Sequence, residues 1–443
     1  MLEEPNLYNT FIILATPVFF ANLLTSVHDI IDAYFLGQIQ NSVSSQAAVS
    51  LSWPILNIFL SLSMGLAVAG VSIISQNMGA DRKEDADNYA GLLFTLSIVV
   101  GVVINALLYA FAPFVISHMG AVGAVYDCCI IYIRVRSFEM PFLLMFGAFQ
   151  AIKQATGDMA APFYISGASV VLNILLTAYF VEGLNWGIFG AAFATLIAQV
   201  ALSPIVLYLL FKKNAHIRIT KKSLHWDLSK IKLLFKIGLP SALGQSISSF
   251  GFLVLNSMIL SYGEAVVAAF SNGNKISGIL LMPIGAIGTV QATYMGQNIG
   301  ASNSHRIMEG YRTGKRLALW FSICGAAILM PLRGVTAAFM SNDSAVISIT
   351  VEYMFWVLLL QPLMGLFDNY IGIFNGSGKT TYSMIINLAR LWVLRIPLIL
   401  IFENFTNFGR VGIWYAMVLS NLLILFVAAY LFKRMNFSSL VNS

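Results

Sequence analysis

Apolar residues run along this chain in long blocks, and short polar segments separate the blocks. An α-helix rises about 1.5 Å per residue, so about 20 apolar residues suffice to cross the hydrocarbon core of a bilayer. The blocks reach that length, and the pattern therefore predicts twelve membrane-spanning helices. We place them at residues 11–36, 47–76, 89–113, 124–149, 162–182, 187–211, 235–260, 267–295, 315–334, 347–374, 382–402 and 411–432.

The composition indicates the same class of protein. Of the 443 residues, 58% are hydrophobic and only 10% are charged, whereas charged residues make up about 25% of ordinary soluble domains. The first residues, Met1–Pro5, lack the basic segment of a cleavable signal peptide, and we expect none. The predicted fold class is therefore an all-α integral membrane protein.

The second half of the chain repeats the first at an offset of 221 residues. Ser75-Gln76-Asn77-Met78-Gly79-Ala80 returns as Gly296-Gln297-Asn298-Ile299-Gly300-Ala301, while Gly187 and Gly190 return one residue later as Gly409 and Gly412. Duplications of this kind are common in secondary transporters, whose substrate site lies between the repeats. Six helices per half is an even number, so we expect two lobes related by a pseudo-twofold axis along the membrane normal.

The polar segments predict the domain boundaries and the orientation. We expect an N-terminal lobe at 1–211, a cytoplasmic linker at 212–232 and a C-terminal lobe at 233–443, with an amphipathic segment at 226–236. Most of the 25 Lys and Arg residues lie in the linker, in the other even-numbered connections and at the termini. Basic loops stay in the cytoplasm, so we expect both termini on that side of a prokaryotic inner membrane. The net charge of +6 is mostly this signal, and we expect no binding of nucleic acid.

Two further patterns point to other chemistry and do not support it. Gly376-Ser377-Gly378-Lys379-Thr380 resembles the end of a phosphate-binding loop, but Ile373 stands where that motif has its first Gly. We interpret the segment as a turn between the tenth and eleventh helices. The 3 Cys and 5 His are scattered, so we expect no disulfide framework, no metal site and no cofactor. No nucleophile stands beside a base, and we expect no enzyme.

Ionisable residues within the predicted helices are the candidates for function, because each costs roughly 2.5–3.5 kcal/mol at the centre of a membrane helix. His28 and Asp32 share one face of the first helix, and Asp29 lies beside them. Either Asp32 binds a coupling cation, or these groups only meet lipid headgroups at the helix end. Neutral oxygen ligands, or simple helix-packing hydrogen bonds, come from Asn173 and Thr177 on the fifth helix and Thr195 on the sixth.

Other charges lie deeper in the predicted helices. Glu139 lies near the middle of the fourth helix and is spaced to pair with Arg136 at i, i+3. In the second half, Asp368 and Arg390 reach similar depths, and Arg395 lies deeper. We interpret Asp368 and Arg390 as a structural or gating pair, with contact to the substrate as the alternative.

Motifs spread over nearly the whole chain resemble one transporter family. They are Pro17 with Asp32-Ala33-Tyr34-Phe35-Leu36-Gly37, Gly65, Ser75-Gln76, Gly79-Ala80, Gly190-Ala191-Ala192-Phe193-Ala194-Thr195 and Gly238-Leu239-Pro240. Together with the helices and the repeat, they resemble the multidrug and toxic compound extrusion (MATE) transporters. The resemblance implies two six-helix lobes in a V shape and export of organic cations. It also implies coupling of Asp32 to H⁺ or Na⁺, with Asn173 and Thr195 beside it and a bend of the first helix at Pro17.

The chain departs from the family at its acidic residues. Many prokaryotic members carry a second carboxylate at the position of Thr177, and another branch carries acids at the positions of Ser248 and Met364. Coupling therefore rests on Asp32, with His28 as a possible relay. A single carboxylate favours H⁺ over Na⁺, unless Asp29 turns inward and supplies a second acid.

These observations predict a secondary antiporter, driven by H⁺ or Na⁺, which exports small organic compounds, cationic or amphiphilic, by alternating access. We expect a monomer among membrane lipids. Four Arg residues within the helices leave a second interpretation open, a flippase or exporter of lipid-linked or anionic amphiphiles. A membrane protein that binds small molecules without transporting them is the third.

Overall fold

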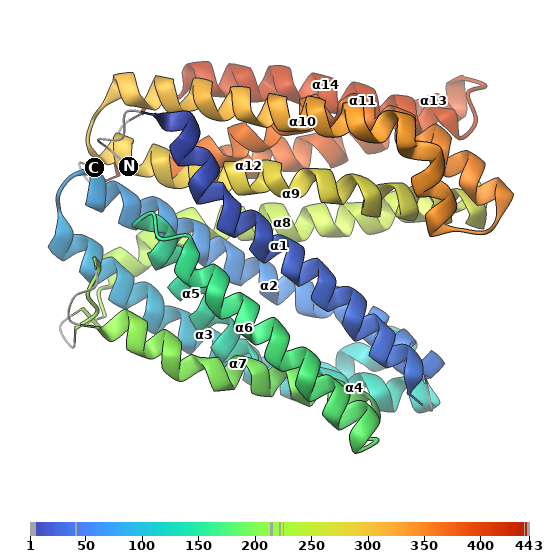
Figure 1. Cartoon of the computed structure of the whole chain (residues 1–443), viewed down its shortest axis with the longest axis horizontal. Helices are drawn as coiled ribbons and strands as arrows, with labels where there is room; N and C mark the ends of the chain where they lie inside the picture. Colours follow the sequence, from blue (N-terminus) through green and yellow to red (C-terminus); the bar gives the residue numbers. More distant parts are fainter. Residues whose placement is uncertain are drawn as a thin grey trace. The chain divides into compact units, whose positions relative to one another are not determined.

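The computed structural model describes residues 6–39, 42–212, 216–220, 223–224, 226–437 and 439–440, and helices dominate these residues without any strand (Figure 1). Within them, eleven helical segments are long and apolar enough to cross a membrane. The remaining expected span consists of two shorter helices, α4 (Gly123–Ser137) and α5 (Met140–Ala155), which are separated at Phe138 and Glu139. The predicted all-α membrane fold with twelve spans is thus confirmed.

The helices form two compact units, which we describe separately. The N-terminal unit, residues 20–242, contains the end of α1 (Leu7–Gln38), α2 (Ser42–Gly79), α3 (Lys83–His118), α4, α5, α6 (Ala160–Thr177), the π-helical η1 (Ala178–Gly183), α7 (Gly187–Phe211) and the start of α8 (Leu228–Leu260). The C-terminal unit, residues 1–19 and 243–443, contains the rest of α1 and α8, α9 (Glu264–Gly300), α10 (Ser304–Met340), α11 (Ser344–Gly376), α12 (Thr380–Leu388), the π-helical η2 (Ala389–Arg395), α13 (Ile396–Phe405) and α14 (Val411–Arg434).

Two helices belong to both units. Helix α1 changes unit after Phe19, and α8 changes unit after Ala242. Each change follows two residues after a proline within the helix, Pro17 in α1 and Pro240 in α8. Proline removes a backbone hydrogen bond and weakens the helix locally, so both helices have their weakest point where they change unit. A hinge at Pro17 stays a prediction.

The expected linker falls partly outside the described residues. Linker residues 213–215, 221–222 and 225 are not among the described ones. The same holds for residues 1–5 at the start of the expected N-terminal lobe and 441–443 at the end of the C-terminal lobe. The expected amphipathic segment at 226–236 is continuous with the seventh span, because α8 already begins at Leu228. The grouping into units places residues 1–19 with the second half and 228–242 with the first, and the lobes expected from the sequence stay a prediction.

The backbone confirms the internal repeat. Residues at positive φ are uncommon unless they are glycine, yet they occur at corresponding places in both halves. The pairs are Asp81 (58°) and Ser302 (53°), Gly157 (86°) and Gly378 (73°), and Gly187 (56°) and Gly409 (56°). The same turns therefore connect the same helices in both units.

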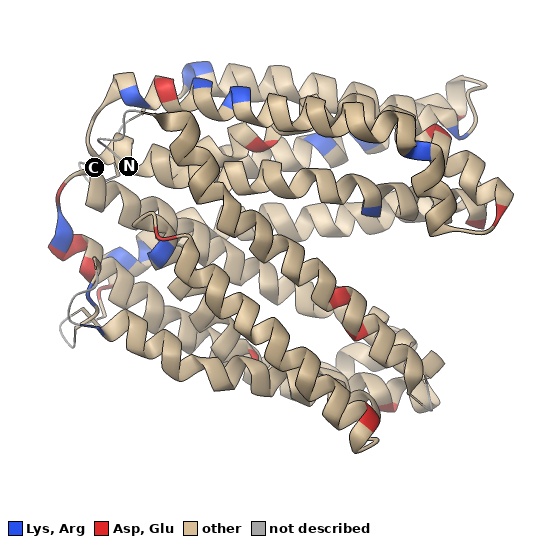
Figure 2. Ribbon diagram, viewed as in Figure 1, with Lys and Arg blue, Asp and Glu red and all other residues tan. Residues whose placement is uncertain are grey.

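Charged side chains lie mainly at helix ends. Figure 2 shows Lys and Arg residues where α2 meets α3 in the N-terminal unit, and where α10 begins in the C-terminal unit. Between the ends, the helices present apolar side chains such as the outward-facing Phe111, Leu175 and Phe426. A belt of exposed apolar residues suits contact with lipid, so the few charges within the spans need a separate explanation.

Candidate functional site

A polar cluster joins three helices of the N-terminal unit. His28 and Asp32 come from α1, Asn173 from α6 and Thr195 from α7. His28 Nε2 lies 3.5 Å from Asp32 Oδ2 and 2.8 Å from the side-chain amide of Asn173. The other end of that amide lies 3.1 Å from Thr195 Oγ1. We call these four residues the coupling cluster, after the role that the resemblance implies for Asp32, and the structure places their side chains in contact with one another.

Asn173 can serve the coupling cluster in two orientations. With its nitrogen toward α1, the amide donates to His28 Nε2 at 2.8 Å and to Asp32 Oδ1 at 3.3 Å, while its oxygen accepts from Thr195 Oγ1 at 3.1 Å. In the opposite orientation the amide oxygen accepts from a protonated His28 Nε2. The amide orientation therefore depends on the protonation of His28.

Two expected members stay at the edge of the coupling cluster. The Asp29 side chain is 70% exposed, and its Oδ1 lies 3.6 Å from Nδ1 of His28. Thr177 is fully buried at the end of α6, and its hydroxyl finds no hydrogen-bond partner among the described residues. Asp29 thus does not turn inward to supply a second carboxylate, and Asp32 is the acid that contacts both His28 and Asn173.

A second charged pair lies in the same unit. Arg136 Nη1 is 2.7 Å from Glu139 Oε2, and the exposed fractions of the two side chains are 15% and 2%. The predicted i, i+3 pair is therefore formed. Glu139 occupies the break between α4 and α5, directly before Met140 and the proline in the first turn of α5. The positive charge of Arg136 also acts on Asp32, which links this pair to the coupling cluster electrostatically.

Asp368 and Arg390 of the C-terminal unit do not form the pair that the sequence predicted. Arg390 stacks on the ring of Phe367, 4.4 Å from its centroid, and contacts Met364 through Nη1 at 3.4 Å. Within the described residues, no carboxylate oxygen lies within 4.0 Å of Arg390 or Arg395. Asp368 acts on Arg390 only over a longer distance, so the expected close ion pair is absent from this structure.

Arg395 instead binds residues that the sequence analysis did not select. Its Nε donates to Ser420 Oγ at 3.2 Å, and its Nη2 donates to Asn421 Oδ1 at 2.8 Å, both on α14. Nearby, the Tyr353 hydroxyl donates to Asn274 Oδ1 at 2.7 Å. These side chains are neutral. The internal repeat could have pointed to Asn421, because Asn421 is the counterpart of the polar Gln199 in the first half.

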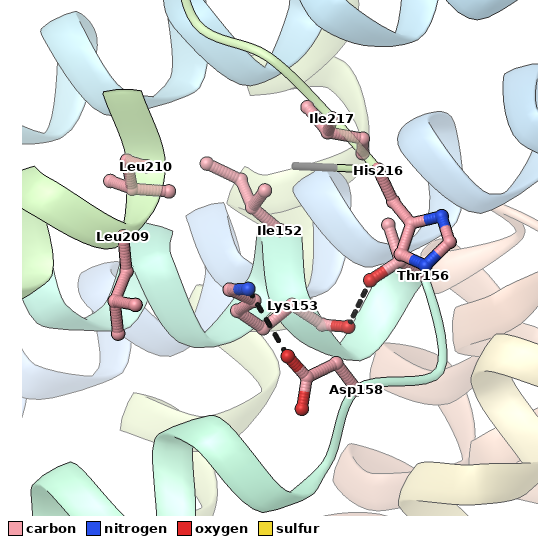
Figure 3. Close-up of a pocket in the computed structure, with 8 residues that line it drawn as sticks. All are labelled: Ile152, Lys153, Thr156, Asp158, Leu209, Leu210, His216 and Ile217. Atoms are coloured by element: carbon pink, nitrogen blue, oxygen red, sulfur yellow. Dashed lines mark hydrogen bonds and ion pairs between the residues drawn. The ribbon is translucent and has the colours of Figure 1, made fainter. Parts of the chain in front are cut away.

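A small cavity lies in the N-terminal unit, beside the turn between α5 and α6 (Figure 3). Its lining residues are Ile152, Lys153, Thr156, Asp158, Leu209, Leu210, His216 and Ile217. Its volume of about 20 Å³ holds roughly one water molecule. Lys153 Nζ and Asp158 Oδ2 pair across it at 3.1 Å, and Asp158 also accepts from the amide of Ala161. The cavity is a structural feature of the turn before α6, too small for an organic substrate.

Comparison with known proteins assigns the family. The MatE family model matches residues 17–179 and 240–401, one match in each half of the repeat. The chain belongs to the MATE transporters. It is therefore a multi-pass membrane transporter of a multidrug-exporting family and not an enzyme.

Relatives of this MATE protein have similar length. The probable multidrug resistance protein YoeA of Bacillus subtilis is 23% identical over 99% of this chain and 97% of its own. The probable multidrug resistance protein NorM of Thermotoga maritima is 24% identical over 94% of this chain and 90% of its own.

Solved MATE structures share the fold. A crystal structure of MATE in complex with MaD3S is 25% identical and matches with a TM-score of 0.91 over 98% of this chain and 97% of that one. A MOP-superfamily transporter from Pyrococcus furiosus, described as having a binding pocket of reverse polarity, matches with a TM-score of 0.90 at 25% identity, over 97% of this chain and 96% of that one.

Proposed function

We propose that this MATE transporter is a proton-coupled antiporter that exports small amphiphilic compounds by alternating access. The coupling cluster carries the proposal, because a carboxylate and an imidazole lie 3.5 Å apart within a membrane-spanning bundle. Ionisable groups are unfavourable there, and those that persist commonly serve ion pathways and proton relays. We further propose that both termini are cytoplasmic in an inner membrane, as the basic helix ends favour.

The ligands around Asp32 favour H⁺ over Na⁺. A sodium ion that loses its water needs several oxygen ligands and enough negative charge to offset its dehydration. Of the described residues, Asp32 is the one that offers a free carboxylate at this place, because Asp29 faces outward and Glu139 is paired with Arg136. A proton needs a single acceptor, and His28 beside Asp32 provides a second group that exchanges protons at physiological pH.

Asn173 provides a mechanical link from the proton to the helices. While Nε2 of His28 is unprotonated, the amide nitrogen donates to Nε2 and to Asp32. A proton on Nε2 reverses the amide, so its oxygen faces α1 and its nitrogen donates to Thr195. The reversed amide still accepts from His28 but no longer donates to Asp32. We propose that this loss of the bond to Asp32, with neutralisation of Asp32, weakens the attachment of α1 to α6 and allows α1 to bend at Pro17.

The relatives' names support export of drug-like compounds, and their family usually takes organic cations. A second candidate, a flippase or exporter of anionic amphiphiles, has support from the unpaired Arg390 and Arg395 in the C-terminal unit. The similar transporter from Pyrococcus furiosus, with its pocket of reverse polarity, is consistent with that alternative. Both candidates share the coupling cluster and differ in the charge of the cargo.

Efflux from proteoliposomes under separately imposed gradients tests the coupling ion. We expect an inward pH gradient in Na⁺-free buffer to drive export of a fluorescent amphiphile, and His28→Ala to slow it several-fold. A strict requirement for Na⁺ at fixed pH would contradict proton coupling. Binding of the amphiphile without any gradient-dependent flux would instead support a membrane binding protein without transport activity.

A further inference from the structure

The internal repeat places Arg395 of the C-terminal unit at or next to the counterpart of Asn173 in the coupling cluster. Matching contacts establish an offset of 222 residues in this part of the chain. Gly190 lies against Phe180 and Trp186, and Gly412 lies in the same way against Phe402 and Phe408. The same offset relates Gln199 to Asn421. Arg395 lies at or directly beside the counterpart of Asn173, because the second half gains its one additional residue between Gly378 and Phe402. Where the first half holds a neutral amide beside a carboxylate, the second half therefore holds a guanidinium.

The π-helical segment η2 brings a second guanidinium toward Arg395. The offset of the repeat is 221 residues at Gly378 and 222 at Phe402, so the second half has one additional residue between them, in the stretch that contains η2. In an α-helix, residues five apart point about 140° away from each other. A π-helix bonds residue i to i+5, which stacks Arg390 and Arg395 on one side.

Arg395 is a buried charge, and no described residue provides a counter-charge within 4.0 Å of it. Its side chain is 3% exposed, and its hydrogen-bond partners in the structure are the neutral Ser420 and Asn421. The main charged group that acts on it is Arg390, whose positive charge repels it. A buried charge without an opposite charge is strongly destabilising, so this arrangement indicates that an anion completes the site.

Arg390 is held by apolar contacts and keeps its hydrogen-bonding capacity. Its guanidinium stacks on Phe367, and its Nε is buried with no hydrogen-bond partner in the part of the chain that the structure describes. Asp368 is the acid that acts on it, from beyond 4.0 Å. The guanidinium groups of Arg390 and Arg395 and the carboxylate of Asp368 together leave a net charge of one positive unit beside η2.

We propose that Arg390 and Arg395 bind the one anionic group, a carboxylate or a phosphate monoanion, of the amphiphilic compound that this transporter exports. The proposal rests on the export function proposed above. Guanidinium groups fit the two oxygens of such groups in a bidentate manner, and one negative charge neutralises the site. The cargo is then an acidic amphiphile, while the proton is taken up at the opposite half of the repeat.

Equilibrium binding to the full-length protein in a non-ionic detergent tests this site without any gradient. The probe is 11-(dansylamino)undecanoic acid, followed by its fluorescence, and its methyl ester is the uncharged control. We expect the acid to bind the wild type at least about 10-fold more tightly than the ester does. Arg390→Gln should weaken binding of the acid about 10-fold and leave the ester unaffected.

Two further variants separate the site from a loss of folding. Arg395→Lys keeps the charge but loses the bidentate geometry, and should weaken binding of the acid several-fold. Arg333→Gln removes a guanidinium of α10 that donates to the carbonyl of Met330, and should leave both affinities unchanged. Equal affinity of acid and ester for the wild type, or unchanged affinity in a folded Arg390→Gln protein, would overturn the proposal.

The source of the anion and the coupling mechanism are tested in the same assay. A dansyl-labelled phosphatidic acid that binds more tightly than the free acid, and depends on Arg390, supports the site with a lipid headgroup as its ligand. Asp32→Asn should leave binding of the acid intact. If Asp32→Asn also leaves gradient-driven export intact, the coupling proposal fails while arginine-dependent binding still supports the anion site.

Discussion

The buried pair of Arg136 and Glu139 offers a quantitative test of how charge is balanced inside the N-terminal unit. Glu139→Gln removes the carboxylate 2.7 Å from a guanidinium that is only 15% exposed. Removing one partner of a buried ion pair typically costs 3–5 kcal/mol, because the other charge stays buried. We therefore expect Glu139→Gln to lower the free energy of unfolding by about 3 kcal/mol. Asp32 still attracts Arg136 in this variant, so we expect the loss to fall at the lower end of that range.

The double variant Arg136→Gln/Glu139→Gln removes both charges and should be within about 1 kcal/mol of the wild type, because replacement of a whole buried pair is often neutral. Equilibrium unfolding in mixed micelles with a rising fraction of sodium dodecyl sulfate measures all four proteins of this cycle. The expected coupling energy is then about 2 kcal/mol or more. Additive losses from the two single variants would refute the argument that the pair is balanced internally.

Two other predictions concern packing and motion. Gly314→Leu should destabilise the protein by about 1–3 kcal/mol, because a side chain there meets Gln291 and Asn369. Adding Gln291→Gly should restore most of the loss, because a glycine at position 291 beside a leucine at position 314 would reproduce the pairing of Gly70 with Leu93 in the first half. Unfolding measurements that show no recovery in the double variant would contradict this equivalence of the two halves. Pro17→Ala should strengthen α1 and slow gradient-driven export several-fold at unchanged substrate affinity, and wild-type flux in this variant would rule out a hinge there.

The sequence was sufficient for the helices because lipid imposes a simple pattern on them. Helix α7 has the predicted bounds of 187–211. The other spans extend beyond the apolar blocks at one or both ends, because polar turns continue the helices there. The break at Glu139 was missed, since Phe138 and Met140 keep the local pattern apolar and a hydrophobic block does not reveal an interruption within it.

The site was predictable where it depends on a single helix. The spacing of His28 and Asp32 places them on one face of α1, and the structure agrees. Contacts across helices depend on depth and rotation, which one sequence does not fix. Two examples are Asp29, which faces outward although it lies beside His28 in the sequence, and Arg395. Arg395 contacts Ser420 on α14 from η2, a π-helical turn that shifts the register by one residue.

Export by the Asp32→Asn variant is the most direct test of the proposed coupling. Proteoliposomes with an inward pH gradient and no Na⁺ are compared for the wild type, Asp32→Asn and the matched control Asp29→Asn, whose carboxylate is 70% exposed. The amide keeps the shape of Asp32 but cannot take up a proton, so the gradient loses its differential effect on the two conformations. We predict loss of gradient-driven export in Asp32→Asn and near wild-type export in Asp29→Asn. Wild-type export by a folded Asp32→Asn protein would contradict the assignment of Asp32 as the coupling residue.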